Sequence, residues 1–341
     1  MHPLLQNQEN KKVLMLGNEA IARGALEAGI AFASAYPGTP SSEIALQFFR
    51  ISLETDLYFE YSVNEKVALE VAAGAAMCGL KTMVSMKHVG LNVASDALVT
   101  LAYTGIAGSM VLVVADDPFM FSSQNEQDSR FYANLSGLPM LEPSTVAEAK
   151  EMAKYAFELS EELRLPVLLR TTTRINHSSG IVTLGSLCEM EIKGGFSKDP
   201  FNLVCIPAVS RKLHPRLLEK IGRAAGMADQ SIWNRIEGDG KWGIICNGVS
   251  YGYVKDAIDE LEETDRFRVL RIGFSYPFPE ELTRQFLNGC EKVLVAEEGE
   301  PWLQETVHAC AQRAGLTVSI RGKEDGLFSR LYEFDPIIVK T

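Results

Sequence analysis

With 341 residues, of which 46% are hydrophobic and 23% charged, the chain is long enough for more than one hydrophobic core and has a globular composition. Its 33 basic and 44 acidic residues give a net charge of −11, which argues against binding to nucleic acid or to an anionic membrane, because both need a basic face. No apolar run approaches the roughly 18 residues of a membrane span, and the polar start lacks a secretory signal, so we expect a cytoplasmic protein.

Strand-like and helix-like segments alternate over the first half of the chain. Expected strands cover residues 12–16, 30–38 (with a turn at the end), 58–63, 82–87, 109–116, 138–143 and 166–172. Expected helices cover residues 19–29, 39–49, 64–79, a stretch around 92–103, and 145–163. This alternation predicts a doubly wound parallel sheet, covered by helices on both faces, in a first domain over residues 1–185.

Residues 186–240 are predicted to be a linker region, with a loop over 194–202 and a connecting helix over 214–228. The alternation resumes at Trp242. Strands are expected over 242–248, 268–273, 292–299 and 316–320, and helices over 252–263, 279–289 and 301–314. The pattern predicts a second, smaller α/β domain over residues 241–341.

Three helix starts are predicted from capping residues. Asn18 would cap the helix after the first strand, and Thr39 would cap the second helix with Pro40 in its first position. Ser62 and Glu65 have the spacing of a capping box, in which the glutamate binds the backbone of the cap residue.

Six cysteines lie far apart, at positions 78, 188, 205, 246, 290 and 310. No two form a Cys-x-x-Cys pair, so no local pattern for zinc or an iron–sulfur cluster is present in the sequence. We expect reduced thiols that are buried or incidental, and no metal site on this chain.

Ligands of an open parallel sheet bind beyond the carboxyl ends of its strands, and three polar segments fall there. Segment 36–42 joins a strand to a helix and either holds an anion, such as a carboxylate, or only caps the helix. Glu65 is either a catalytic carboxylate or a capping-box residue. Segments 87–92 and 116–128 should form the third polar group, with 116–128 as a loop over the mouth of the sheet.

Two further patterns in these segments have ordinary explanations. A lone histidine such as His88 is usually structural, and the pair Asp116 and Asp117 before a proline is more typical of a turn than of a metal site. The stretch after Gly17 lacks the second and third glycines of a dinucleotide fingerprint, so we expect no nicotinamide cofactor there.

Five successive motifs resemble one known family. They read YPGTPSSEI, SVNEKVALEVAAGAA, MKHVGLNVASD, LVVADDPFMFSSQNEQDSRFYA and KYAFELSEELRLPVLLRTTTR, and the resemblance covers residues 12–180 almost continuously. The first domain is similar to the thiamine diphosphate pyrimidine-binding domain of the indolepyruvate ferredoxin oxidoreductase alpha subunit, in the 2-oxoacid:ferredoxin oxidoreductase superfamily. The second, with CNGVSYGYV and VLVAEEGEP, resembles more loosely the transketolase C-terminal-type domain that follows in that family.

The resemblance implies a thiamine-diphosphate-dependent enzyme that oxidatively decarboxylates arylpyruvates such as indolepyruvate. The products would be an acyl-CoA, carbon dioxide and reduced ferredoxin. Glu65 matches the carboxylate that hydrogen-bonds the aminopyrimidine of the cofactor and activates it. Thr39 matches a threonine beside the substrate carboxylate, and His88 falls where a Gln-Gly segment approaches the cofactor in the pyruvate enzymes. Expected substrate contacts are Thr39, His88 and Ser123, and expected cofactor contacts are Glu65, Tyr36, Asn92 and Gln124.

Two departures from the family pattern limit this expectation. Pyruvate enzymes bring an arginine to the substrate carboxylate from the loop where this chain has Asp116 and Asp117, which argues against a pyruvate-like substrate. Full-length alpha subunits continue into a diphosphate-binding domain with Mg²⁺ and a ferredoxin-like domain, and nothing here resembles either. We therefore expect a fragment or a split subunit, incomplete by itself. A diphosphate-binding, ferredoxin-type subunit or domain, together with a gamma- or beta-type subunit, would supply Mg²⁺ and the iron–sulfur clusters.

Two other functions stay open. An E1 beta-type subunit of a 2-oxoacid dehydrogenase, or half of a transketolase, has the same domain order, although the SSQNEQDSR and MKHVG motifs argue against it. A non-catalytic assembly subunit would keep the fold without the chemistry, and the presence of Glu65 argues against that.

Overall fold

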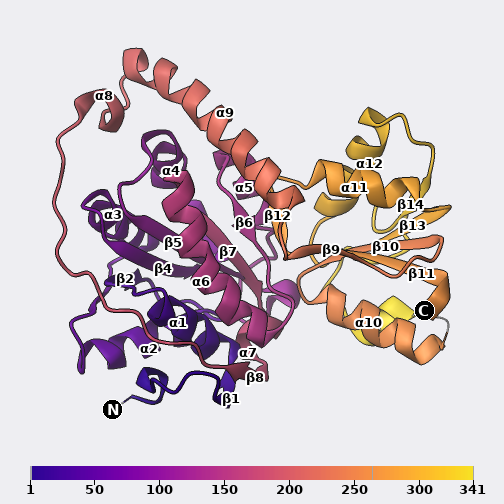
Figure 1. Cartoon of the computed structure of the whole chain (residues 1–341), viewed down its shortest axis with the longest axis horizontal. Coiled ribbons are helices and arrows are strands. Elements are labelled where there is room, and N and C mark those ends of the chain that lie inside the picture. The colour runs from indigo at the N-terminus through magenta and orange to yellow at the C-terminus, as the bar shows by residue number, and fades with distance from the viewer. Residues whose placement is uncertain (1, 263, 341) are drawn as a thin grey trace.

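The structure is a computed structural model that describes residues 2–262 and 264–340. Its largest sheet lies in the part formed mainly by the N-terminal half of the chain (Figure 1). Its seven strands lie in the order β12-β6-β7-β5-β4-β2-β3. They are β2 (Phe32–Ala35), β3 (Tyr58–Tyr61), β4 (Lys81–Lys87), β5 (Ser109–Asp116), β6 (Met140–Leu141), β7 (Val167–Thr172) and β12 (Phe274–Tyr276). All neighbours are parallel except β12, which runs antiparallel to β6, so the predicted parallel sheet is confirmed.

Helices cover both faces of this sheet, as the alternation predicted. They are α1 (Gly17–Glu27), α2 (Ser42–Ser52), α3 (Glu65–Met77), α4 (His88–Thr104), α5 (Arg130–Ser136), α6 (Val146–Leu163) and α7 (Thr173–His177). Helices α1 and α6 pack against each other on one face, and α3 and α4 pack against each other on the other (Figure 1). Short 3₁₀ helices are η1 (Pro3–Leu5), η2 (Pro118–Met120) and η3 (Thr264–Arg266).

A second sheet follows later in the chain, with the strand order β14-β13-β10-β11-β9. Its strands are β9 (Asn234–Glu237), β10 (Trp242–Asn247), β11 (Phe267–Ile272), β13 (Lys292–Ala296) and β14 (Ser319–Arg321). The remaining helices are α8 (Pro200–Leu203), α9 (Pro207–Asp229), α10 (Ser250–Leu261), α11 (Glu280–Asn288), α12 (Trp302–Arg313) and α13 (Pro336–Lys340). Strands β11 and β13 belong to the smaller sheet, but β12, which lies between them in sequence, joins the larger sheet. The chain therefore crosses from the smaller sheet to the larger one and back again (Figure 1). The domain bounds stay a prediction.

The first predicted strand is not part of the larger sheet. It forms β1 (Lys12–Leu16), which pairs antiparallel with β8 (Ser179–Thr183) in a separate ribbon. Leu14 is 72% exposed and only Met15 of this strand is buried, so the expectation that residues 12–16 form a strand of the parallel sheet is wrong. The cause is that a short apolar run does not by itself distinguish a central strand from a surface ribbon.

The predicted caps of the first two helices are wrong. Helix α1 begins at Gly17, two residues earlier than predicted, and Asn18 lies inside it, fully buried, where its side-chain nitrogen donates to the carbonyl of Pro40 at 2.7 Å. Helix α2 begins at Ser42 rather than after Thr39, because the backbone N–H of Ser41 first closes a turn onto the carbonyl of Gly38 at 2.8 Å.

The predicted capping box of α3 is also wrong. Asn64 is the cap, and its side-chain oxygen accepts from the backbone N–H of Val67 at 2.9 Å. The hydroxyl of Ser62 instead donates to Glu60 at 2.9 Å. Glu65 is therefore the first residue of the helix and takes no part in capping it.

Within residues 2–262 and 264–340, none of the helices is both long enough and apolar enough to cross a membrane.

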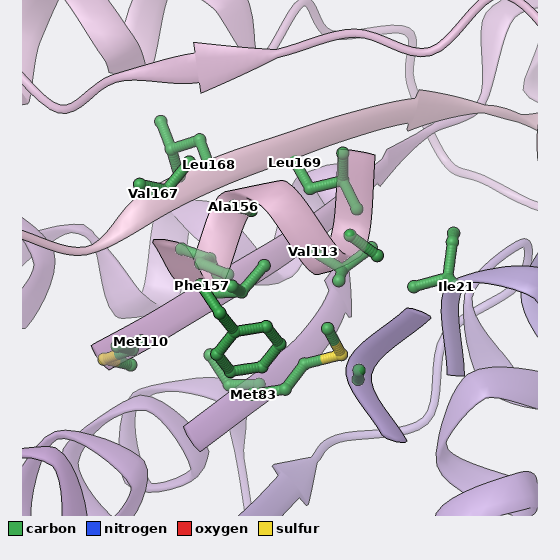
Figure 2. Close-up of a cluster of buried hydrophobic side chains, with 14 of the residues drawn as sticks. Ile21, Met83, Met110, Val113, Ala156, Phe157, Val167, Leu168 and Leu169 are labelled. Atoms are coloured by element: carbon green, nitrogen blue, oxygen red, sulfur yellow. The ribbon is translucent and has the colours of Figure 1, made fainter. Parts of the chain in front are cut away.

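Figure 2 shows the centre of the larger core, where Phe157 of α6 lies among Met83, Met110 and Val113 of the strands. All four side chains are fully or almost fully buried. Close packing of this kind makes the loss of a large side chain costly, because the neighbours fill the space only in part.

We expect Phe157→Ala to lower the free energy of unfolding by about 3–5 kcal/mol through the cavity it leaves. Phe131→Ala on α5 is the matched control, because Phe131 is 46% exposed and its loss should change stability by about 0.5 kcal/mol or less. Urea unfolding followed by circular dichroism measures both changes. Equal losses from the two variants would contradict the packing described here.

Candidate active site

The carboxyl ends of the central strands meet at one edge of the larger sheet, and all three polar segments lie there. In the register of the sheet Ala35 pairs with Tyr61 and with Ser85, and Lys87 pairs with Ala115. The segments that follow these strands, 36–42, 62–65, 87–92 and 116–128, therefore lie along the same edge of the sheet, as the sequence predicted from the strand ends, and this edge is called the opening below.

Glu65 and Gly90 are in close contact at this opening. Glu65 is half-buried at the start of α3, and its side chain lies over Gly90 of α4. A Cβ atom on Gly90 would lie 2.5 Å from Cγ of Glu65 and 2.6 Å from its Oε1, so no other residue fits there without displacing the glutamate. Among the described residues, nothing donates a hydrogen bond to the carboxylate of Glu65, so both of its oxygens can accept one from a bound molecule.

His88 begins α4, two residues before Gly90, and is fully buried. Burial lowers the pKa of its ring, and the nearby carboxylate of Asp116 opposes the shift in part. The ring is therefore neutral at pH 7, with one nitrogen as donor and the other as acceptor. Neither nitrogen has a hydrogen-bond partner in the described part of the chain, which is costly unless a bound molecule or water meets them.

Lys87, the last residue of β4, crosses the turn that contains Gly38 and Thr39. Its ammonium group donates to the carbonyl of Ser122 at 2.7 Å. Burial lowers the pKa of Lys87, and the charge of Asp117 opposes this shift. Lys87 is the first residue of the predicted polar segment 87–92 but was not among the predicted site residues. The signal that could have identified Lys87 is its position, because a lysine at the end of a buried central strand is unusual.

Asp117 holds the loop that follows β5. Its two carboxylate oxygens accept hydrogen bonds from the backbone N–H of Ser122 at 2.9 Å, the hydroxyl of Ser123 at 2.6 Å and the hydroxyl of Thr173 at 2.9 Å. Burial alone would raise the pKa of Asp117, but these hydrogen bonds outweigh it and the pKa is lowered. The hydroxyl hydrogen of Ser123, predicted to contact substrate, is thus committed to the loop.

The other predicted contacts are spread around the opening. Thr39 is half-buried in the turn beneath Lys87, and Tyr36 is partly exposed in the same turn. Asn92 is exposed one turn further along α4 than His88, and its side-chain oxygen accepts from the hydroxyl of Tyr132. Gln124 is exposed in the loop. Glu65 therefore lies against Gly90, two residues after His88, and Lys87 lies against Gly38, the residue before Thr39, while Asn92 and Gln124 are exposed.

Buried charged groups connect this edge to the smaller sheet, and sequence reasoning missed them. Arg170 of β7 donates to Asp116 at 2.7 Å, and Arg130 donates to Glu297 at 2.6 Å and also to Asp128. All five side chains are buried. The only sequence signal for these ion pairs was the presence of charged residues in the QDSR and AEEGE stretches. A single sequence does not show that Arg130 pairs with Glu297, which lies more than 160 residues away. No group of three or more His, Cys, Asp or Glu side chains in the described ranges is arranged to hold a metal ion.

Glu298, next to Glu297 in the chain, is a further buried carboxyl group at this place. One of its oxygens accepts from the backbone N–H of Phe334 at 3.1 Å, and the other has no partner among the described residues. Burial raises the pKa of Glu298 to about 7, against the opposing effects of the Phe334 N–H and the Arg170 guanidinium.

We expect the stability of the protein to fall as the pH rises from about 4.5 to about 7, in part because of Glu298. Its ordinary pKa is 4.5, so over this range the folded state keeps a proton that the unfolded state has lost. Glu298→Gln should remove this dependence and stabilise the protein above pH 7, by an amount on the order of 3 kcal/mol. Thermal melts at several pH values test this, with the exposed Glu305→Gln as control. An unchanged pH profile in Glu298→Gln would contradict the assignment.

A doubly wound, mostly parallel sheet followed by a smaller α/β sheet is thus the fold of this chain, and the part that contains the larger sheet matches a thiamine diphosphate-binding family. Residues 23–197 match the family described as "Pyruvate flavodoxin/ferredoxin oxidoreductase, thiamine diP-bdg". The chain belongs to this family.

Curated proteins similar to this chain are named as oxidoreductase subunits, in agreement with the family match. The chain is 47% identical over 343 residues to the indolepyruvate oxidoreductase subunit IorA of Methanothermobacter thermautotrophicus, a match that covers 100% of this chain and 55% of the relative. It is 49% identical to the subunit of the same name from Thermococcus kodakarensis, covering 97% of this chain and 52% of the relative. The chain therefore spans about half the length of the curated relatives it matches.

Two solved structures share the fold at low identity. A 2-oxoglutarate:ferredoxin oxidoreductase from Magnetococcus marinus matches with a TM-score of 0.78 at 17% identity, over 96% of this chain and 64% of that chain. A split gene transketolase, described as an inactive beta4 tetramer, matches with a TM-score of 0.61 at 17% identity, over 96% of both chains.

Proposed function

We propose that the chain activates the cofactor in a thiamine-diphosphate-dependent 2-oxoacid:ferredoxin oxidoreductase of the cytoplasm. The enzyme would oxidatively decarboxylate arylpyruvates such as indolepyruvate and transfer the acyl group to coenzyme A. The observation that carries the proposal is the carboxylate of Glu65, which lies at the mouth of the sheet over Gly90. The family match and the relatives named indolepyruvate oxidoreductase support the reaction class and the substrate.

The described residues fit the aminopyrimidine end of the cofactor. Gly90 leaves room for the side chain of Glu65, whose oxygens accept no hydrogen bond from any described residue, and the buried His88 precedes Gly90 by two residues. Thiamine diphosphate, when bound, acts as the electron sink for cleavage beside a carbonyl group. Glu65 would hold a proton at its carboxylate and exchange it with a ring nitrogen, a role for which a glutamine amide is unsuited. In this proposal Tyr36, Asn92 and Gln124 contact the cofactor from the rim.

The substrate would lie between this carboxylate and the turn at Thr39, with further contacts from His88 and Ser123. The diphosphate, its Mg²⁺ and the iron–sulfur clusters would be held by a diphosphate-binding, ferredoxin-type subunit or domain and a gamma- or beta-type subunit. The length of the curated relatives, about twice that of the matched region, supports this division.

A transketolase-like or E1 beta-type half-enzyme is the second candidate. The likeness to the split gene transketolase, which covers 96% of both chains, favours it. The two candidates differ in the fate of the electrons. Reduction of ferredoxin by the complete complex supports the first, and sugar transfer or reduction of lipoamide supports the second.

We expect Glu65→Gln to leave folding nearly intact and to remove most of the activity of the complete complex. Glutamine keeps the shape of the side chain, and Asn64 rather than Glu65 caps the helix, so the melting temperature should change little. Proton exchange between the cofactor and deuterated solvent should slow by about 10²–10⁴-fold, the usual size of a general acid–base contribution. Glu70→Gln, an exposed position on the same helix, is the control. An unchanged exchange rate in Glu65→Gln would refute the catalytic assignment.

We also expect aromatic 2-oxoacids to be preferred over pyruvate by about 10-fold or more in kcat/KM. Phe119, Met120 and Phe121 lie in the loop after β5 with substantial exposure, and they offer apolar surface near the opening. Burying an aryl group against such surface contributes about 25 cal/mol per Å² of area removed from water. Turnover of indolepyruvate, phenylpyruvate and pyruvate by the complete complex measures this preference, and a higher value for pyruvate would contradict it.

A further inference from the structure

We propose that Lys87 is the cation that binds the carboxylate of the 2-oxoacid substrate. This inference rests on the proposed function and specifies which group of this chain recognises the charged end of the substrate.

The first argument is the position of the side chain. Lys87 ends β4, and a Cβ atom on Gly38 would lie 2.9 Å from its Cγ and 3.0 Å from its Cδ. The aliphatic part of Lys87 therefore lies directly on the turn before α2 and depends on the absence of a side chain at Gly38. Thr39, whose hydroxyl is expected beside the substrate carboxylate, is the next residue of that turn.

The second argument is the number of hydrogen bonds that Lys87 leaves open. An ammonium group has three N–H donors, and the chain satisfies one of them through the carbonyl of Ser122 at 2.7 Å. Among the described residues no other acceptor or ion pair is formed with this group, although Asp117 is close enough to influence its pKa. The oxygens of Asp117 already accept from Ser122, Ser123 and Thr173. Two N–H donors of a half-buried cation therefore remain for a bound carboxylate.

The third argument is that the other cations near this edge are already paired. Arg170 is buried and bonded to the carboxylates of Asp116 and Glu142. Arg174 forms an ion pair with Glu333. Arg170 and Arg174 thus each have a carboxylate partner, whereas Lys87 forms no ion pair with any carboxylate of the described residues. An anionic substrate at this opening would supply the missing partner.

Two inhibitors can show whether Lys87 binds the carboxylate of the substrate or only has a structural role. 3-Phenyllactate and 3-phenyllactamide share the side chain and the 2-hydroxyl group and differ in the charge of the carboxylate. Both are tested as competitive inhibitors of phenylpyruvate turnover by the complete complex, and calorimetry measures their binding directly. Lys87→Met should weaken 3-phenyllactate by about 10- to 100-fold, the size of a lost charged hydrogen bond, and the amide by about twofold or less.

Three further variants sharpen the test. Lys87→Arg keeps the charge and should retain most of the preference for 3-phenyllactate over the amide. Gly38→Ala keeps Lys87 but displaces its stem, so it should reduce that preference in part. Lys81→Met is the matched control, because Lys81 lies at the opposite end of the same strand and also donates to a backbone carbonyl, that of Ala28 at 3.1 Å. It should leave the preference unchanged.

The outcomes distinguish this inference from the proposed function. If Lys87→Met weakens both inhibitors equally, or weakens neither, Lys87 only supports the loop and the inference is wrong while the function stands. If Lys87→Met does not assemble, an unchanged preference in Gly38→Ala overturns the inference and a reduced one supports it. If the native complex turns over no aromatic 2-oxoacid, the proposed function fails, and calorimetry with the two inhibitors still decides the role of Lys87.

Discussion

The structure around the opening depends on one buried cation, Arg130. Its guanidinium group is fully buried and donates to Asp128, at the end of the loop after β5, and to Glu297, which follows β13 of the smaller sheet. It also donates to the backbone carbonyls of Glu298 at 2.7 Å and Glu300 at 2.9 Å. A buried ion is tolerated only when its hydrogen bonds are met, and loss of one partner costs about 3–5 kcal/mol. The end of the loop is therefore bound to the segment after β13, while Asp117 holds its start.

The two sheets therefore contribute to the candidate site in different ways. The larger sheet supplies the side chains at the opening, among them Glu65, His88 and Lys87. The segment that follows β13 of the smaller sheet holds the end of the loop that borders them, through the ion pair of Glu297 with Arg130.

Two glycines allow the close contacts on which the site depends. At Gly90 the side chain of Glu65 occupies the space that a Cβ atom would take, and at Gly38 the stem of Lys87 does the same. In both places a helix or turn approaches a charged side chain more closely than any other residue would permit. The carboxylate and the ammonium group are thereby fixed by packing of their stems, while their polar ends remain open.

The sequence by itself determined the alternating pattern, the parallel sheet and the polar segments at its strand ends, because the periodicity of apolar residues is local. It also singled out Glu65, by resemblance. Only the tertiary structure decided three features: the helix caps, the pairing of β1 with β8 in a separate ribbon, and the pairing of β12 with β6 in the larger sheet. Each of them depends on which distant segment packs nearby. The same holds for Lys87 across Gly38 and for Arg130 with Glu297. These pairs lie 49 and 167 residues apart, and only folding brings them into contact.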